Sequence, residues 1–281
     1  MIDIKLLEQL CLCNGISGDE GNVRNLIINE IKDCADEIKT DNLGNLIVFK
    51  KGKKSAKSKL MVSAHMDEVG LMVTDITSDG YLKFDEVGGI DRRVLPGKRV
   101  CVGRNGLNGV IGVKPIHLTN GDEKTAVPKM NDMYIDIGAE SREDALKYVN
   151  YGDSINFEGD FKINGKTVVT KALDDRFGCY VLINLIKSEP EYDMYFTFVV
   201  QEEVGLRGAR PAAFTVNPDF ALVIESTTAA DVAEVDASHQ VCNLSKGATV
   251  TVMDRATVYD KEMISAAFEL AEKNNIAVQY K

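Results

Sequence analysis

The sequence predicts an α/β fold whose mixed, mostly parallel sheet carries helices on both faces, with a small β-barrel or sandwich inserted into it. Helix-spaced apolar segments alternate with short strand-like runs in residues 1–67 and 164–281, which is typical of such a sheet. In residues 68–163 short apolar stretches alternate with glycine turns, which is typical of a small all-β unit. We therefore expect one α/β domain formed by residues 1–67 and 164–281 and an inserted domain formed by residues 68–163.

The first α/β segment is expected to begin with two helices. Ser17-Gly18 interrupts a helical pattern that resumes at Val23 and continues through the first forty residues. A turn then precedes a strand at 46–49. The run 60–64 is short, apolar and bounded by polar residues, which indicates a strand buried on both faces. The apolar face of the first helix consists of Leu6, Leu7, Leu10 and Cys11.

Later elements follow from the same signals. Ser141 and Asp144 are spaced like a helix cap and predict a helix over 141–149 at the end of the inserted domain. A helix over 174–186 is expected to bury Phe177, Val181, Leu182 and Leu185. We expect further helices at 206–214 and 260–274, and strands at 168–169 (its apolar run extending to 173), 195–200, 220–224, 248–253 and 276–280.

Composition excludes several functional classes. The net charge of −10 argues against a general nucleic-acid binder, which needs a cationic surface, and is compatible with a carboxylate-rich site that holds cations. No apolar run is long enough to cross a bilayer, and the N-terminus lacks the core of a signal peptide. We interpret the scattered cysteines, among them Cys34, Cys101, Cys179 and Cys242, as reduced core thiols of a cytoplasmic protein.

Carboxylates or a histidine directly follow each of four apolar runs. Because ligands of open α/β sheets bind beyond the carboxyl ends of the strands, these side chains are expected to meet in one crevice. So many acids would repel one another strongly unless protons or cations neutralised them. The segments are His65-Met66-Asp67, Asp174-Asp175, Gln201-Glu202-Glu203 and Glu225.

A histidine among carboxylates suits hard or borderline divalent cations, so we expect two ions of zinc, cobalt or manganese per subunit and no organic cofactor. Each residue also has a simpler interpretation. His65 alone could be a satisfied core histidine, and Asp174-Asp175 could be first-turn acids of the helix that follows. Glu225 is the hardest to explain in that way, because a charge that abuts a buried strand needs a partner.

The chemical requirements of a two-metal site suggest a role for each residue of this cluster. Asp174 is the candidate that bridges two ions, His65 and Glu225 would complete one site, and Glu203 would contribute to the other. Asp67 could accept the second imidazole N–H of His65 and fix its tautomer, and Asp175 would orient ligands. Glu202 lies beside a ligand and, as a non-ligand, could act as general base on the attacking water.

The strings that contain these residues resemble the aminopeptidases of peptidase family M42, which include glutamyl, lysyl and tetrahedral (TET) enzymes, some labelled endoglucanases. The resemblance covers essentially the whole chain, and its most specific strings are Ser63–Gly70 (SAHMDEVG), Ala172–Arg176 (ALDDR) and Gln201–Ala209 (QEEVGLRGA). Further matches lie at 88–91, 134–139, 225–231 and 253–255.

The resemblance implies that Glu202 is the catalytic base and that His65, Asp174, Glu203 and Glu225 are metal ligands, with Glu225 standing where many members carry aspartate. It also implies that the inserted domain drives assembly into dimers and then a twelve-subunit particle. The family pattern continues through a Gly-Gly-x-Asp segment to a final ligand histidine, whereas this sequence ends at Lys281. We therefore expect an incomplete second metal site and weak or absent activity, unless a neighbouring subunit or His239 compensates.

The leading functional hypothesis is thus a metal-dependent aminopeptidase that removes N-terminal residues from short peptides. Two alternatives stay open: a two-metal deacylase of N-acyl amino acids, and a catalytically impaired, truncated scaffold that keeps the oligomerising domain. A cellulase is disfavoured because the chain contains no Trp to line a sugar-binding cleft.

Overall fold

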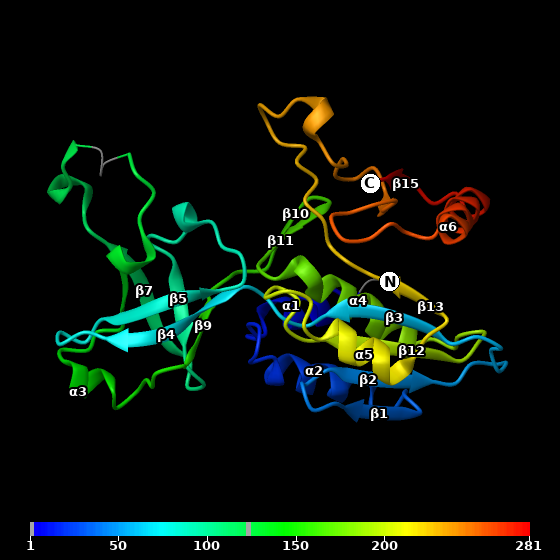
Figure 1. Ribbon diagram of the computed structural model, residues 1–281, viewed down its shortest axis with the longest axis horizontal. Coiled ribbons are helices and arrows are strands. Elements are labelled where there is room, and N and C mark those ends of the chain that lie inside the picture. The colour runs from blue at the N-terminus through cyan, green and yellow to red at the C-terminus, as the bar shows by residue number, and fades with distance from the viewer. Residues whose placement is uncertain (1–2, 122–124) are drawn as a thin grey trace. The chain divides into compact units, whose positions relative to one another are not determined.

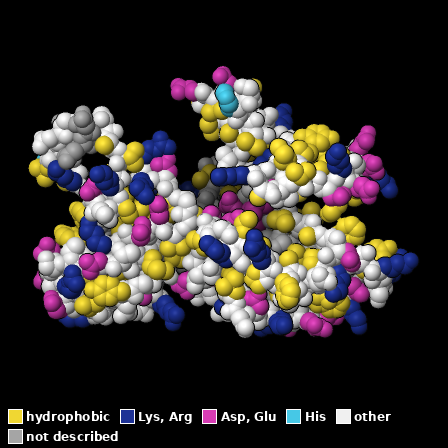
Figure 2. Space-filling model, viewed as in Figure 1, with side chains coloured by type: hydrophobic (Ala, Val, Ile, Leu, Met, Phe, Trp, Pro, Cys, Tyr) yellow, Lys and Arg dark blue, Asp and Glu magenta, His cyan; other side chains and the backbone are white. Residues whose placement is uncertain are grey.

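The computed structural model describes residues 3–121 and 125–281, which divide into two compact units, one ending at residue 226 and the other comprising residues 227–281 (Figure 1). Side chains of both charge signs are interspersed over the face shown in Figure 2. In the described part of the chain, no helix is both long and apolar enough to cross a membrane.

The first unit is built on a mixed sheet with the strand order β1-β2-β12-β3-β13. β3 pairs in parallel with β12 on one side and β13 on the other, whereas β2 pairs antiparallel with β1 and β12. This arrangement confirms the predicted α/β fold class. The strands are β1 (Glu37–Thr40), β2 (Leu46–Lys50), β3 (Leu60–His65), β12 (Met194–Val199) and β13 (Phe220–Val223).

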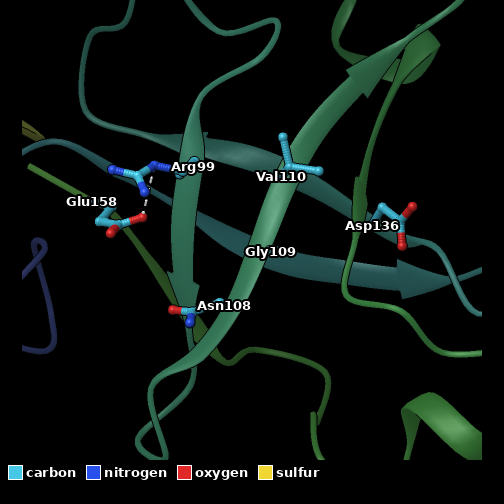
Figure 3. A pocket seen from close by; sticks show the side chains of 6 residues that line it. All are labelled: Arg99, Asn108, Gly109, Val110, Asp136 and Glu158. Atoms are coloured by element: carbon cyan, nitrogen blue, oxygen red, sulfur yellow. Dashed lines mark ion pairs between the residues drawn. The ribbon is translucent and has the colours of Figure 1, made fainter.

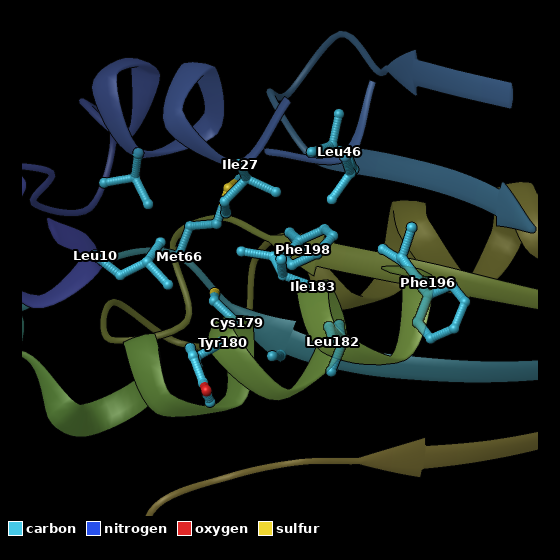
Figure 4. Packing of buried hydrophobic residues seen from close by; sticks show 14 of the residues in the cluster. Leu10, Ile27, Leu46, Met66, Cys179, Tyr180, Leu182, Ile183, Phe196 and Phe198 are labelled. Carbon is cyan, nitrogen blue, oxygen red and sulfur yellow. The ribbon is translucent and has the colours of Figure 1, made fainter. Parts of the chain in front are cut away.

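Helices cover both faces of this sheet because successive residues of its central strands, which point to opposite faces, are apolar. Phe196 and Phe198 of β12 point to the side occupied by α1 (Ile4–Leu12), α2 (Gly21–Ile31) and α4 (Leu173–Lys187), where they form the main core (Figure 4). On the other face Ile47 and Met61 pack against Val216 of α5 (Ala209–Val216).

Three sequence-based predictions about this domain were wrong. Residues 37–40 form the edge strand β1 and not the end of a helix. The apolar run 168–173 does not join the sheet: β11 (Thr167–Val169) pairs with β10 (Lys162–Asn164) in a separate hairpin. In α4, Phe177 and Leu185 are exposed, because Asp174 and Asp175 have non-helical backbone angles and the regular turns begin after them.

The inserted strands close into a barrel with the order β4-β5-β8-β7-β6-β9, which leaves no open sheet edge. Its interior is filled by apolar side chains such as Leu71, Phe84, Ile111 and Ile135. Ser141 caps α3 (Arg142–Ala145) by accepting the Asp144 N–H at 3.2 Å, although the α-helix ends earlier than predicted. The strands are β4 (Gly70–Ile76), β5 (Leu82–Val87), β6 (Arg99–Val102), β7 (Leu107–Val113), β8 (Met133–Asp136) and β9 (Ser154–Phe157).

The second unit contains a parallel pair, β14 (Ala248–Val250) and β15 (Val278–Tyr280), connected through α6 (Lys261–Lys273). Asp260 caps α6 by accepting the Met263 N–H at 2.9 Å, as its position in the sequence predicted. The ring of Phe268 on α6 stacks on Tyr280 of β15 with centroids 4.0 Å apart.

The six cysteines of the chain are free thiols. Cys11 and Cys179 are buried, and burial raises the pKa of the Cys11 thiol to about 11, so it stays protonated. Cys34, Cys101 and Cys242 are only partly buried, which corrects their interpretation as core residues.

One buried cation connects the first helix with the start of α4. The guanidinium of Arg176 is fully buried and donates to the carbonyl oxygens of Met66, Leu10 and Cys13 at 2.6–2.7 Å. It also lies 3.4 Å from the Glu68 carboxylate. The planar guanidinium fork suits several acceptors at once, so Arg176 satisfies carbonyl groups that no water can reach.

We expect Arg176→Ala to lower the free energy of unfolding by about 3–5 kcal/mol, because it leaves Glu68 and several buried carbonyl groups without this partner. The loss is measured by urea denaturation of protein that has been treated with a chelator to remove divalent cations. The control is Lys187→Ala, which removes a partly exposed ion pair with Glu30 and should cost about 1 kcal/mol or less. Equal losses in the two variants would contradict this account.

Candidate metal centre

The candidate centre is built around His65, the last residue of β3, whose side chain is buried. Its ring atom Nδ1 lies 3.0 Å from the backbone oxygen of Asp67 and 3.4 Å from that residue's carboxylate. A carbonyl oxygen can only accept a hydrogen bond, so Nδ1 carries a proton. The other ring nitrogen, Nε2, is therefore the atom that is presented to the surrounding carboxylates.

Three carboxylates face Nε2 of His65. The distances are 3.1 Å to Oδ1 of Asp174, 3.6 Å to Oε1 of Glu225 and 3.9 Å to Oε2 of Glu202. Glu202 and Glu225 follow the parallel strands β12 and β13, which flank β3 and end at the same edge of the sheet. The strand ends thus gather these groups as the sequence predicted.

Asp174 reaches the same place by a different route from the one predicted. It lies at the start of α4, as the helix predicted over 174–186 requires, but the run that precedes it is not a strand of the main sheet. The peptide bond from Asp174 to Asp175 is cis. Its neighbour Asp175 is fully buried and accepts from the His65 N–H at 3.2 Å and from the Gly178 N–H at 2.9 Å. Asp175 therefore fixes the backbone of His65.

The Asp67 carboxylate lies beneath the cluster and organises the turn that bears Glu202 and Glu203. It accepts the Glu202 N–H at 2.9 Å, the Glu203 N–H at 3.1 Å and the Ser17 hydroxyl at 2.6 Å. These hydrogen bonds, together with His65, hold the pKa of Asp67 below its usual range despite the opposing effect of burial. Asp67 thus contacts His65 as predicted and also positions two further carboxylates.

Three other acids at the cluster, Asp175, Glu202 and Glu203, resist ionisation. Burial raises the pKa of Asp175 to about 8, with a further contribution from Glu225, and raises that of Glu203 to about 7. Burial also raises the pKa of Glu202, partly opposed by His65. For His65 burial alone would lower the pKa, but hydrogen bonds to Asp174 and Asp67 outweigh it and raise the pKa strongly. The cluster therefore retains protons that a cation could replace.

The spacing of the donor atoms fits a small divalent cation. Ligand atoms held tetrahedrally at about 2.1 Å from one ion lie about 3.4 Å from one another. Nε2 of His65 lies 3.1 Å from Asp174 and 3.6 Å from Glu225, close to that separation. Imidazole nitrogen and carboxylate oxygen are donors that zinc, cobalt and manganese accept.

Two groups of residues in the described chain could each hold an ion. One comprises His65, Asp174 and Glu225, and the other comprises His65, Glu202 and Glu203. The expected partnership of Asp174 with Glu203 is not among these groups. His239 belongs to the second compact unit, and His117 lies in the barrel segment.

A pocket of about 430 Å³ gives access to the cluster, and Asp174 and Glu203 line it. The turn after β5 approaches closely, because a Cβ atom at Gly88 would lie 3.2 Å from Cβ of Glu203 and 2.9 Å from Val69, and φ of Gly88 is +88°. Only glycine fits there without strain. The other lining residues are Glu68, Val69, Gly89, Phe157, Lys171, Ala172 and Leu173.

A second hollow of about 310 Å³ lies on the barrel, where Arg99 and Glu158 form an ion pair at 3.1 Å (Figure 3). Asn108, Val110 and Asp136 complete its wall. Neither of the two metal-compatible groups found in the described chain contains any of these residues, so the pocket at the strand ends is the candidate site.

Two residues that support the site, Ser17 and Glu20, were not predicted from the sequence. Ser17-Gly18 was interpreted only as a helix break, yet its hydroxyl binds Asp67. Glu20 is buried and accepts the Gln201 N–H at 3.1 Å. Glu20 lies 47 positions before Asp67 and 181 before Gln201, so no local sequence pattern indicates its role. Its contact with the Gln201 N–H exists only in the folded chain.

Comparison with known proteins gives a consistent result. Residues 44–281 match the family model described as M42 glutamyl aminopeptidase. A protein of Acetivibrio thermocellus designated a candidate aminopeptidase is 45% identical over 98% of this chain and 80% of its own length.

Solved structures of similar proteins share the fold. The TET aminopeptidase of Thaumarchaeota archaeon SCGC AB-539-E09 superimposes with a TM-score of 0.93 at 34% identity, covering 99% of this chain and 80% of that one. The TET1 peptidase of Pyrococcus horikoshii, which can assemble into a tetrahedron or a large octahedral shell, has a TM-score of 0.86 at 40% identity over 99% and 83% of the two chains.

In the chelated protein we expect stability to decrease as pH rises. Asp175 keeps its proton up to about pH 8 when folded, whereas an unfolded aspartate loses its proton near about pH 4. Between these values the folded state binds one more proton, so the free energy of unfolding falls by up to about 1.4 kcal/mol per pH unit. Asp175→Asn should make this slope shallower in urea titrations between about pH 5 and 7.

The matched control for this experiment is Asp33→Asn, which changes an exposed aspartate. It should leave the pH slope unchanged. The account would fail if the Asp175→Asn slope were as steep as that of the parent protein.

Proposed function

The chain belongs to the M42 family of aminopeptidases, and from this premise we propose that it removes N-terminal residues from short peptides with Glu202 as general base. The observation that carries this proposal is the convergence of three carboxylates on Nε2 of His65, at 3.1–3.9 Å, beside an accessible pocket. If the experiments below contradict this proposal, they would favour the two-metal deacylase or the catalytically impaired scaffold instead.

His65, Asp174 and Glu225 would hold one divalent ion, and Glu203 would contribute to a second. The chemistry that such ions supply when bound is to lower the pKa of a water and to polarise the scissile carbonyl. The spacing of the three donors around His65 supports the first site. Zinc, cobalt and manganese all suit this donor set.

Glu202 fits the role of general base because its carboxylate faces the cluster and its backbone is fixed by Asp67. It would take a proton from the attacking water and deliver it to the departing amine. Burial raises the pKa of Glu202, so its carboxylate is a stronger base than an exposed glutamate. Asp67 holds the turn that carries Glu202, and Asp175 holds the backbone of His65, so the carboxylate and the imidazole keep their relative positions.

Self-association forms part of the proposal. The related TET1 peptidase assembles into large particles, and Ile116 and Leu118 of this chain expose 69% and 57% of their surface on the barrel segment. Apolar side chains exposed to that degree suit a protein–protein interface. We propose that the segment 68–163 acts as the dimerisation domain of a cytoplasmic homo-oligomer.

We expect Glu202→Gln to lower kcat by about 10²- to 10⁴-fold, because the amide cannot accept the proton of the attacking water. The divalent ion content per chain, measured by elemental analysis, should remain that of the parent. Glu189→Gln changes a side chain that is 82% exposed and should retain full activity. An unchanged kcat in Glu202→Gln would refute the assigned role.

A substrate panel separates an aminopeptidase from a deacylase. We expect the metal-loaded protein to cleave aminoacyl-anilides and to leave the same compounds intact when their amine is acetylated, because an aminopeptidase recognises the free amine. Chelation should abolish cleavage and added divalent ion should restore it. Preferred hydrolysis of N-acyl amino acids would instead establish the deacylase. Hydrolysis at only a background rate, equal in the parent and in Glu202→Gln, would leave only the scaffold.

A further inference from the structure

The turn that carries Glu202 and Glu203 is held by side chains from a distant loop. Gln201, the first residue of this turn, has φ of +55°, in the left-handed region that residues with a side chain adopt only at a cost in free energy. The amides of Gln201, Glu202 and Glu203 all bond to carboxylates from other parts of the chain, with donor–acceptor distances of 2.9–3.1 Å. The conformation of the turn therefore depends on those carboxylates.

Two of the groups that restrain this turn come from the loop between α1 and α2. Glu20 is buried, and its Oε1 accepts both the Gln201 N–H at 3.1 Å and the Gly18 N–H at 2.7 Å. The buried Ser17 donates its hydroxyl to Oδ2 of Asp67, the same oxygen that accepts the Glu203 N–H. One residue thus binds the turn directly, and the other orients the carboxylate that binds it.

The loop itself is anchored independently of the turn. Ser17 N–H donates to the Glu68 oxygen at 3.3 Å, and Glu68 N–H donates to the Gly15 oxygen at 3.1 Å. Asp19 accepts the hydroxyl of Ser154, on strand β9 of the barrel, at 2.8 Å. Because these anchors do not involve residues 201–203, Ser17 and Glu20 reach the turn from a support whose position is fixed by other contacts.

We propose that Ser17 and Glu20 are positioning residues that hold the Gln201–Glu203 turn, and with it the Glu202 carboxylate, in the orientation that hydrolysis requires. This inference rests on the proposed function of Glu202. In the part of the chain that the structure describes, neither side chain is hydrogen-bonded or ion-paired to His65, Asp174 or Glu225. Both act through backbone amides or through Asp67. Charged acceptors make stronger bonds to amides than neutral ones, which explains a buried acid at position 20.

Two variants and a matched control test this inference. Ser17→Ala and Glu20→Ala should each lower kcat about tenfold or more and change KM less than about threefold, because a displaced base impairs the proton transfer more than substrate binding. Glu20→Gln, whose amide oxygen can still accept the Gln201 N–H, should recover a large part of the loss. Asp33→Asn changes an exposed side chain beyond the end of α2 and should behave as the parent.

Hydrogen–deuterium exchange supplies a readout that is independent of activity. In the chelated protein, peptides that contain residues 201–203 should exchange about tenfold faster in Ser17→Ala and Glu20→Ala, whereas peptides from β3 should not change. If Glu20→Ala exchanges rapidly throughout and is therefore unfolded, the milder Ser17→Ala carries the test.

Parent-like exchange at 201–203 in these variants would overturn the proposal, and so would faster exchange without any fall in kcat. A parent protein with no Glu202-dependent hydrolysis would refute the proposed function instead. The exchange experiment would still decide whether Ser17 and Glu20 hold the turn.

Discussion

The constraint on which the site depends is the concentration of negative charge around one buried imidazole. Asp174, Glu202 and Glu225 all lie within 3.9 Å of Nε2 of His65. Such a group of acids cannot be fully ionised in a partly buried place without a compensating positive charge, and the raised pKa values of His65, Glu202 and Glu203 express this requirement. Bound protons supply this positive charge in the isolated chain, and divalent cations supply it in the proposed function.

The parallel pairing of β12, β3 and β13 creates this concentration, and the surrounding structure keeps it in place. Parallel strands end at one edge of the sheet, so the residues that follow them converge. Buried polar groups then fix each segment: Asp175 binds the backbone of His65, Asp67 binds the amides of Glu202 and Glu203, and Arg176 ties the start of α4 to the first helix. A rigid arrangement of this kind supports a catalytic site because little reorganisation is needed during reaction.

The barrel contributes to the pocket as well as forming a separate core. Gly88 follows β5 and allows the turn to approach Glu203, while Lys171 and Glu68, paired at 2.7 Å, also line the pocket. The inserted segment therefore shapes access to the carboxylates.

The sequence by itself determined the fold class, the barrel and the clustering of His65, Asp174, Glu202, Glu203 and Glu225, because strand-end residues and periodicity are local signals. It did not reveal that the run 168–173 ahead of Asp174 lies outside the main sheet, since Val168 and Val169 have the apolar character of sheet residues. Nor did it reveal that Ser17 and Glu20 contact or orient the groups that hold the Gln201–Glu203 turn. Hydrogen bonds between residues up to 181 positions apart leave no periodic trace, and only the tertiary structure decides them.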